Sequence, residues 1–266
     1  MKKGLSNLIL LLVFFLGLSL LLYPTVSDYW NSFLQTVAIK NYTEAVVDIE
    51  EEEYQKLLQQ AKAYNEELKT DDNRWELTRK ERKLYESTLD VSGTGVMGYI
   101  EIPVLDCELS IYHGSGDEIL RDSIGHIEGS SLPVGGKGTH AVLSGHRGLP
   151  SAKLFSDLDK MVEGDLFFLQ ILNQTLIYEV DQIAIVLPND LEKLKIEEDE
   201  DYCTLVTCTP YGVNTHRLLV RGHRVDENRR DALMRVSADA TQIDPMVIAP
   251  FAAAPILLLL LIALLI

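Results

Sequence analysis

Two uncharged apolar runs, one near each end, limit what this chain can fold into. Residues 4–24 and residues 245–266 contain no Asp, Glu, Lys or Arg and are dominated by apolar side chains. Each run is long enough to cross a hydrocarbon core of about 30 Å as a helix. We therefore expect an N-terminal membrane anchor (1–24), a part outside the bilayer, a juxtamembrane linker (226–244) and a C-terminal transmembrane segment (245–266).

Each run has an alternative interpretation. The first could be a signal peptide, but its apolar core exceeds the usual length and no small-x-small cleavage site follows, which favours an uncleaved anchor. Lys2 and Lys3 precede it and place the following chain outside the cell by the positive-inside tendency. The second run could be a buried C-terminal helix, although its unbroken apolar end, 256–266, argues against this in a soluble domain. Arginines 229, 230 and 235 precede this run on the outer side, against the same tendency.

Charge and cysteine content exclude several kinds of site. A net charge of -16 argues against nucleic acid as a partner, because phosphate binding needs a basic face. Three cysteines do not suit a disulfide framework, and Cys203 and Cys208 would lie about 16 Å apart in one extended strand, too far to pair. There is no CxxC pair and no zinc-like histidine spacing. No metal or cofactor is therefore expected.

The part between the apolar runs changes character near Gly93 and Gly95. Before them, residues 25–90 are expected to form a helical extension, because apolar residues recur on one helical face from Tyr54 to Leu68. A second polar helix is predicted at 76–89. After them, residues 91–225 contain short β-prone runs separated by turn-forming residues, which is typical of a barrel or sandwich. These runs are 97–102, 107–112, 139–144, 166–172, 176–186, 202–207 and 217–225, with short helices expected at 117–124 and 151–158.

Cys208 is the candidate nucleophile, because it ends a β-prone run two residues before Pro210. A thiol needs a base or cation nearby to react at neutral pH. His146 ends another predicted strand beside Gly145, and Arg217 opens the strand after the loop that follows Cys208. The nine-residue spacing predicts two antiparallel strands with the guanidinium across from the thiol, where it could hold an oxyanion. The alternatives are a surface histidine in a turn and an arginine in a strand-face salt bridge.

These motifs resemble those of one enzyme family. Thr204-Leu-Val-Thr-Cys208 resembles the TLxTC signature of sortases, and the segment Leu-Ser-Gly-His146-Arg-Gly and the step to Arg217 also match. The stretches 97–103 and 111–114 resemble the opening strands of class C, the pilin-polymerising branch. The layout of anchor, helical extension and second anchor is similar too.

The resemblance implies a mainly β fold, a sortase-type closed β-barrel with short helices, preceded by the helical extension and flanked by transmembrane helices. It implies a cysteine transpeptidase on the extracellular face of a Gram-positive plasma membrane, with a monomeric catalytic domain and the lipid bilayer as a partner. Pilin precursors with LPxTG-like sorting signals would be its substrates, cleaved between Thr and Gly and joined to a lysine amine of the next pilin.

The resemblance also assigns site residues. Cys208 would be the nucleophile that forms a thioacyl intermediate, His146 the general acid and base, and Arg217 the group that holds the substrate or the oxyanion. His140 and Thr207 would form walls of the substrate site.

Class C sortases often carry a lid, an Asp-Pro-aromatic triplet, and here the matching stretch at 70–76 contains Asp71, Asp72 and Trp75 but no proline. We expect Trp75 to cover Cys208 and Asp71 or Asp72 to face Arg217. Alternatively, Trp75 is only a helix-packing aromatic.

Two further functions stay open at this point. A housekeeping-type sortase, which attaches surface proteins to cell-wall peptidoglycan, would share Cys208, His146 and Arg217. A membrane-tethered β-barrel scaffold with an inert cysteine would need none of them. Cys107 and Cys203 are interpreted as buried small hydrophobic residues, the usual role of free cysteine.

Overall fold

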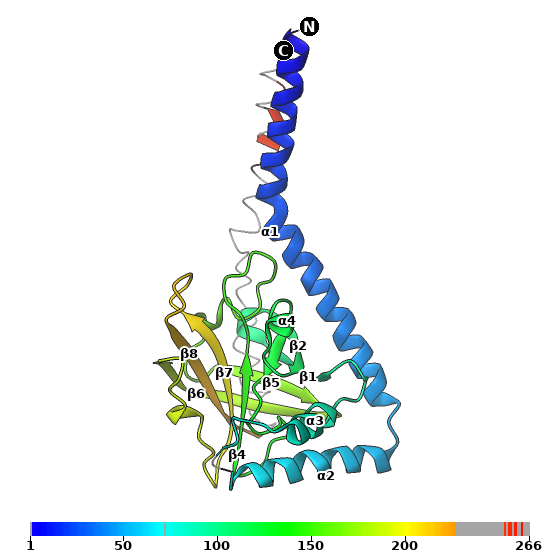
Figure 1. Cartoon of the computed structure of the whole chain (residues 1–266), viewed down its shortest axis with the longest axis vertical. Helices are drawn as coiled ribbons and strands as arrows, with labels where there is room; N and C mark the ends of the chain where they lie inside the picture. Colours follow the sequence, from blue (N-terminus) through cyan, green and yellow to red (C-terminus); the bar gives the residue numbers. More distant parts are fainter. Residues whose placement is uncertain are drawn as a thin grey trace.

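The computed structural model describes residues 2–71, 73–226 and scattered positions between 253 and 262. Within these residues, three long helical segments lead into a closed eight-stranded β-barrel (Figure 1). The predicted mainly β fold with an N-terminal helical extension is confirmed. Asp72, the predicted linker and most of the predicted C-terminal segment lie outside the described residues.

The first helix, α1, runs without a break from Lys2 to Val47, so the predicted anchor and the start of the extension form one element. Figure 1 shows α1 projecting from the barrel as a stem and changing direction along its length; Pro24 lies within it and removes one backbone hydrogen bond. Over Leu5–Val47 the helix contains a window of mean hydropathy 2.6, none of it buried. Among the described residues it is the one helix long and apolar enough to cross a membrane.

The second half of α1 is fixed to the barrel by polar side chains. Gln35 donates to the carbonyl of Asp122 and to Ser123 Oγ, and its Oε1 accepts from the amide and hydroxyl of Ser110. Tyr42 Oη donates to the carbonyl of Met97 at 3.0 Å. Because Gln35 and Tyr42 are buried, these bonds satisfy groups that would otherwise be costly to remove from water.

Two further helices complete the extension. The helix α2 (Glu51–Leu68) buries Tyr54, Leu58, Ala61, Tyr64 and Leu68, which confirms the predicted apolar face. The helix α3 (Arg79–Ser87) is shorter than the predicted 76–89, because Thr78 ends the preceding coil with a capping box to Glu81.

The barrel has the strand order β1-β2-β3-β4-β7-β8-β6-β5 and closes between β5 and β1. All seven predicted strands are present with small shifts at their ends, and β3 was missed because three residues give too little periodicity to detect. The predicted helix at 117–124 is limited to α4 (Asp117–Leu120). No α-helix forms at 151–158, where Leu154 has a left-handed φ of 39°, and only a 3-10 turn begins at its end (Leu158–Lys160). The strands are β1 (Val96–Ile102), β2 (Cys107–His113), β3 (Ile124–His126), β4 (Thr139–Ser144), β5 (Leu166–Ile171), β6 (Gln174–Val186), β7 (Asp201–Thr209) and β8 (His216–Arg224).

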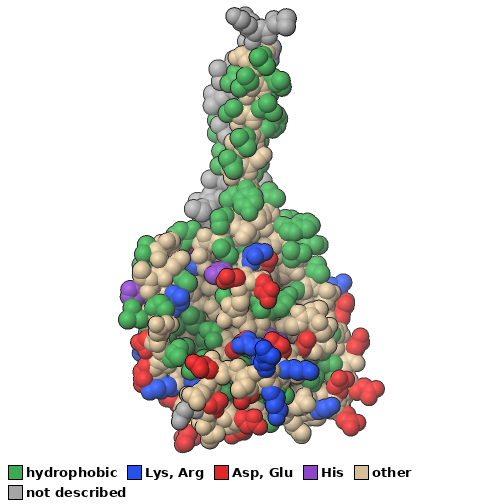
Figure 2. Space-filling model, in the orientation of Figure 1, with side chains coloured by type: hydrophobic (Ala, Val, Ile, Leu, Met, Phe, Trp, Pro, Cys, Tyr) green, Lys and Arg blue, Asp and Glu red, His purple; other side chains and the backbone are tan. Residues whose placement is uncertain are grey.

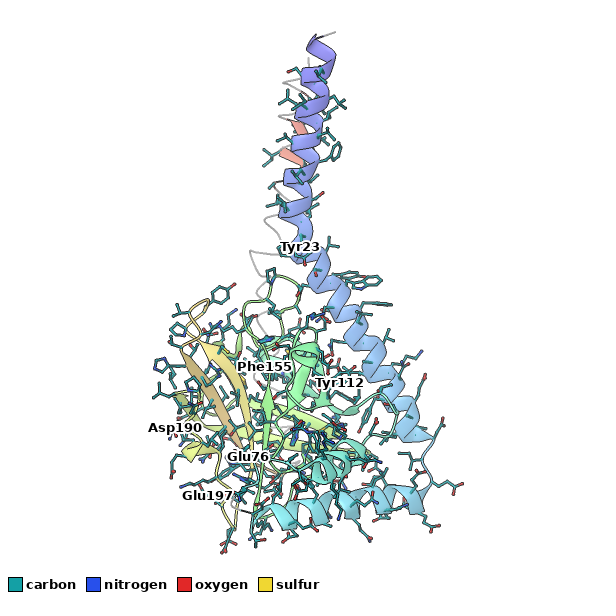
Figure 3. The ribbon with its side chains drawn as sticks, viewed as in Figure 1. Tyr23, Glu76, Tyr112, Phe155, Asp190 and Glu197 are labelled. Atoms are coloured by element: carbon teal, nitrogen blue, oxygen red, sulfur yellow. The ribbon has the colours of Figure 1, made fainter. Side chains whose placement is uncertain are left out.

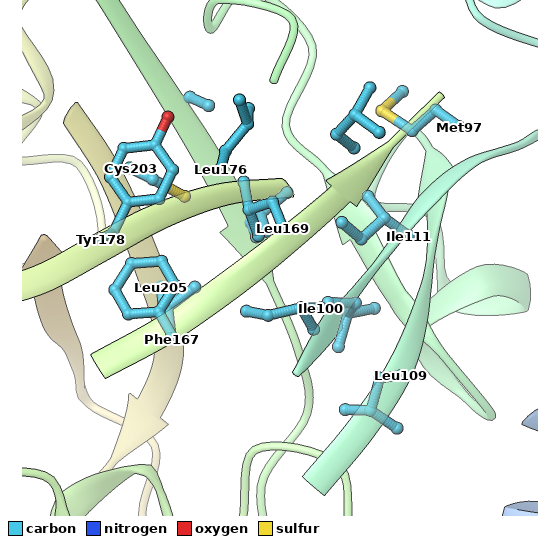
Figure 4. Close-up of a cluster of buried hydrophobic side chains, with 14 of the residues drawn as sticks. Met97, Ile100, Leu109, Ile111, Phe167, Leu169, Leu176, Tyr178, Cys203 and Leu205 are labelled. Atoms are coloured by element: carbon cyan, nitrogen blue, oxygen red, sulfur yellow. The ribbon is translucent and has the colours of Figure 1, made fainter. Parts of the chain in front are cut away.

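Alternating side chains give the barrel wall two apolar faces. The inner face forms the main core (Figure 4). There the rings of Phe167 and Tyr178 stack with their centres 5.4 Å apart, and Cys203 and Leu205 point inward from β7. Burying each such large side chain contributes about 1.5–3 kcal/mol. A second cluster lies on the outer face of β4, β7, β8 and β6. It contains Val142, Val186, Leu194, Val206 and Leu219, and we call it the outer cluster.

Candidate active site

Cys208 lies on the outer face of β7, at the end of the strand. Side chains alternate along a strand, so Cys208 faces the same way as Val206 of the outer cluster and opposite to the buried Leu205. Its side chain is half-buried, and the peptide bond of Thr209–Pro210, just after it, is cis. The nucleophile candidate is therefore accessible at the rim of an otherwise packed sheet.

Arg217 is the register partner of Cys208 on the antiparallel strand β8, as the nine-residue spacing predicted. Its Nη1 donates to the carbonyls of Asn214 and His216, at 3.3 and 3.1 Å, which holds the side chain beside the β7–β8 loop. No ion pair among the described residues uses this guanidinium. Its remaining donors and its charge are available to an anionic oxygen of a ligand.

His146 reaches the same place through the parallel pairing of β4 with β7. Ser144 is in register with Val206, and the amide of Gly145 donates to the carbonyl of Val206 at 3.1 Å. His146 lies in the turn that directly follows β4, whose last residue is paired with Val206, two residues before Cys208. Two strand ends and one strand start thus bring the segments that carry the three predicted residues to the same edge of the barrel.

The turn that carries His146 is packed tightly against the barrel. A Cβ at Gly145 would lie 2.6 Å from the ring of Phe155, so only glycine allows this approach. The amide of Phe155 donates to the carbonyl of His146 at 3.2 Å, and Arg147 forms an ion pair with Asp159. The backbone at His146 is consequently fixed on both sides.

Thr207 and His140, the two residues expected to form walls of the substrate site, are buried. Thr207 is 2% exposed, points to the face opposite Cys208, and its Oγ1 donates to the carbonyl of Gly145 at 2.8 Å. His140 is 1% exposed; its Nδ1 bonds the carbonyl of Lys195 and its Nε2 bonds the hydroxyl of Thr204. Because burial lowers the pKa of His140 to about 4, its ring is neutral, with Nδ1–H donating and Nε2 accepting.

The other two cysteines have environments that suppress reactivity. Burial raises the pKa of Cys203 well above its usual value and raises that of Cys107 to about 12. Both thiols therefore stay protonated at neutral pH. Cys203 is buried as predicted, whereas Cys107 is only half-buried and packs against the main core. Among the three, Cys208 lies on the outer face with Arg217 as its register partner.

The segment 70–76 lies over the outer cluster, and Trp75 packs against it. Arg74 fixes this segment, a role that sequence reasoning missed. Its Nη2 donates to the carbonyl of Leu194 at 2.9 Å, its guanidinium lies 4.5 Å from the centre of the Trp75 ring, and burial lowers its pKa. A Cβ at Gly129 would lie 2.2 Å from Arg74 O, so a glycine with a φ of 84° is needed beneath it.

Asp71 was expected to face Arg217, and its described contacts lie elsewhere. Its Oδ1 accepts from the amide of Asn73 at 2.8 Å. With Arg74, Glu192 and Lys195 it lines a pocket of about 510 Å³ between the segment 70–76 and the β6–β7 loop. Asp72, the other candidate, lies outside the described residues. Trp75 packs on the outer cluster, which contains Val206, two residues before Cys208.

Comparison with known proteins identifies this arrangement. The model of the family "Sortase domain" matches residues 100–225. A crystal structure of sortase C1 from Streptococcus agalactiae is 55% identical, covers 71% of this chain and 98% of its own, and superposes with a TM-score of 0.69. The chain belongs to the class C sortases.

Other relatives place this sortase within the wider family. A crystal structure of sortase C from Streptococcus pneumoniae, described for its catalysis and pilin substrate specificity, is 44% identical, covers 71% of this chain and 96% of its own, and has a TM-score of 0.63. Sortase D of Bacillus subtilis is 28% identical over 131 residues, which are 48% of this chain and 63% of that protein. This sortase thus spans less than two thirds of the curated relative but nearly the whole of the class C structures.

The site contains no evident metal-binding group. Among the described residues, no cluster of three or more His, Cys, Asp or Glu side chains is placed to hold a metal ion. The chemistry that the geometry supports is acyl transfer through a thiol, with one imidazole and one guanidinium beside it.

Proposed function

We propose that this chain is a membrane-anchored cysteine transpeptidase that polymerises pilins. The observation that carries the proposal is the position of Cys208, half-buried on the outer face of a sortase barrel, opposite Arg217 and beside the turn that holds His146. A thiol in this setting has a proton carrier on one side and a cation on the other. Both are needed for attack on an amide carbonyl.

The reaction would proceed in two acyl transfers. The thiolate of Cys208 attacks the threonine carbonyl of an LPxTG-like sorting signal, and Arg217 stabilises the oxyanion. The Thr–Gly C–N bond then breaks, and the imidazolium of His146 gives its proton to the glycine amine, leaving a thioester. A lysine amine of the next pilin attacks this thioester and passes a proton to His146. An isopeptide bond forms, and the thiolate leaves.

Two observations support a pilin as the substrate and a membrane as the location. The pneumococcal sortase C that this chain resembles is described for its pilin substrate specificity. The helix α1 is long and apolar enough to span a bilayer, and Lys2 and Lys3 at its start favour a cytoplasmic N-terminus with the barrel outside.

The decisive experiment offers the full chain a sorting-signal substrate together with two acceptors. One acceptor is a pilin subunit with its lysine, and the other is a peptidoglycan stem peptide. Covalent ladders built through the pilin lysine are expected, together with a thioacyl adduct on Cys208 detected by mass spectrometry. Exclusive use of the stem peptide would assign the chain to wall attachment instead. No cleavage and no adduct, even after deletion of residues 70–76, would refute a transpeptidase.

A further inference from the structure

Just beyond the predicted anchor, α1 turns its polar face to the barrel and its apolar face to solvent. The polar face points to the barrel: Asp28 accepts from the amide of Lys153 at 2.7 Å, and Asn31 and Gln35 are 6% and 5% exposed. The opposite face is apolar and open to solvent. A surface helix of a soluble protein has the reverse arrangement. The outward residues, which we call the α1 stripe, are Val26, Tyr29, Trp30, Phe33, Leu34 and Val37, with exposed fractions from 38% to 76%.

The end of the barrel beside the stem exposes large apolar side chains as well, next to charged ones such as Lys160 and Glu163. By the strand pairings, β1, β4, β6 and β7 finish at this end and β2, β5 and β8 begin there; we call it the stem end. Cys208 lies at the stem end. The bond between Asp28 and Lys153 joins it to α1, in agreement with Figure 1. Its loops expose five large apolar side chains by 52% to 66%: Val104, Val162, Leu187, Tyr211 and Val213.

The far end of the barrel has the opposite character. The exposed acids Glu51, Glu52 and Glu53 begin α2, which lies along that end (Figure 1). Lys137 and Asp199 there form an ion pair with side chains 78% and 88% exposed. Figure 2 shows hydrophobic side chains on the shoulder below the stem and most of the visible charged ones further from it. In Figure 3, Phe155 lies nearer the stem than the labelled Glu76 and Glu197. Large exposed apolar side chains are therefore gathered toward the stem, and the far end is mainly charged.

We propose that the α1 stripe and the apolar loops of the stem end rest together on the outer surface of the lipid bilayer, so that Cys208 acts at the membrane surface. The proposal rests on the membrane anchoring proposed above. The α1 stripe continues directly from the apolar run, and Tyr and Trp side chains are characteristic of the membrane interface. Asp28, which holds the loop after β4, follows Pro24 by only four residues, about 6 Å along a helix.

Charge favours a lipid surface in this orientation. The chain carries a net charge of -16, and the acids at the start of α2 lie far from the stem. Anionic lipid headgroups repel such an acidic end and tolerate an apolar one. The exposed apolar side chains at two separate elements would then be covered by one flat surface.

The test measures the depth of labels on the full chain in lipid nanodiscs that contain nitroxide-labelled lipids. In a Cys208→Ala background, single cysteines replace Val162 or Val213 and carry a small fluorophore; the signal of the parent chain is subtracted. Lys137→Cys and Asp199→Cys are matched controls at the far end, and Leu16→Cys reports the membrane span. Quenching by headgroup nitroxides is expected to be at least about two-fold at residues 162 and 213 and near zero at 137 and 199.

Several results would overturn the proposal. Labels at 162 and 213 that are no more quenched than those at 137 and 199, while residue 16 is quenched, would mean that the barrel stands clear of an anchored stem. An unquenched label at residue 16 would refute anchoring itself and the docking with it. Labels at 162 and 213 that are shielded from aqueous iodide yet unquenched by lipid would mean that protein, for example a second copy, covers this end.

A second variant tests the α1 stripe separately. Trp30→Glu with Phe33→Glu places two charges on the stripe at exposed positions, so the fold and its melting temperature are expected to stay unchanged. Quenching at residues 162 and 213 is expected to fall by at least about half, because charges are expelled from the interface. Val47→Glu, also on α1 and 76% exposed but far from the span, is the matched control and should change nothing. Unchanged quenching in the double variant would contradict the proposal.

Discussion

The outer face of β7 presents two sites of similar composition, one at each end. Each combines a histidine from β4 or the turn after it, a small polar side chain of β7 and the arginine paired with it on β8. The stem-end site contains His146, Cys208 and Arg217. The far-end site contains His140, Thr204 and Arg221.

The two sites differ in what their side chains already bind. In the far-end site, both ring nitrogens of His140 are bonded, and Arg221 makes two hydrogen bonds to Asp181, at 3.0 and 2.8 Å, while lying 4.0 Å from the centre of the Tyr202 ring. In the stem-end site, Cys208 is half-buried, and within the described part of the chain Arg217 bonds only two nearby carbonyls. The same residue types thus stabilise the fold at one end and remain available for chemistry at the other.

The largest expected difference between the sites concerns the nucleophile. Cys208→Ala should abolish thioacyl capture of a sorting-signal peptide, a loss of at least about 10³-fold, because no other accessible thiol lies there. Thr204→Ala should keep the reaction and lower the free energy of unfolding by about 1–2 kcal/mol, since His140 loses a buried partner. Mass spectrometry of the adduct and urea unfolding measure the two effects. Cleavage by the Cys208→Ala variant would show that the nucleophile is misassigned.

Substitutions of the two arginines should also have different consequences, with a smaller effect on activity than the loss of Cys208. Arg217→Ala is expected to lower kcat/KM about 10²-fold with little change in melting temperature, because an oxyanion partner is lost. Arg221→Ala should instead lower the free energy of unfolding by about 1–3 kcal/mol, because it leaves the half-buried Asp181 without its partner. Steady-state kinetics measure kcat/KM of the two variants, and thermal melting measures their stability. Equal losses of activity in the two variants would remove the distinction between the sites.

Acid should weaken the far-end site through His140. Its folded pKa of about 4 lies below the unfolded value near 6.5, so only the unfolded state binds a proton between these pH values. The free energy of unfolding should therefore fall as pH decreases from about 6.5 to 4, by about 3 kcal/mol for this residue.

The buried His126, whose pKa is also lowered to about 4 by burial, should add a similar amount. His140→Gln is expected to remove roughly half of the combined slope. Urea unfolding at several pH values measures this, with His146→Gln as the matched control. An unchanged slope in His140→Gln would show that the ring is not held neutral.

The smallest expected effect concerns access to the stem-end site. Trp75→Ala removes the ring that packs on the outer cluster beside Val206, and should raise the rate at which Cys208 reacts with a thiol reagent by several-fold. Trp30→Ala, a change of the other tryptophan, is the control. If both variants react at the rate of the unchanged chain, the segment 70–76 does not limit access to the thiol.

Sequence patterns located the barrel strands and the three catalytic candidates because those features are local. Alternating apolar residues gave the strands, and the step from Cys208 to Arg217 fixed one antiparallel pair whose register the structure confirms. The roles of Arg74 and Gly129 could not be predicted, because they depend on a contact between segments more than fifty positions apart. Likewise, the burial of His140 could not be predicted, because its ring bonds the carbonyl of Lys195, which lies 55 positions away.

The sequence by itself determined the order of apolar run, helical extension and barrel, and the residue types able to carry thiol chemistry. Hydrophobic periodicity and residue spacing act along the chain, so they can be recognised without knowledge of the fold. The tertiary structure alone decided that His140 is buried with both ring nitrogens bonded, that Arg217 forms no ion pair among the described residues, that Trp75 packs on the outer cluster, and that α1 exposes an apolar face away from the barrel. Those properties depend on burial and on partners distant in sequence, and packing fixes both only when the barrel closes.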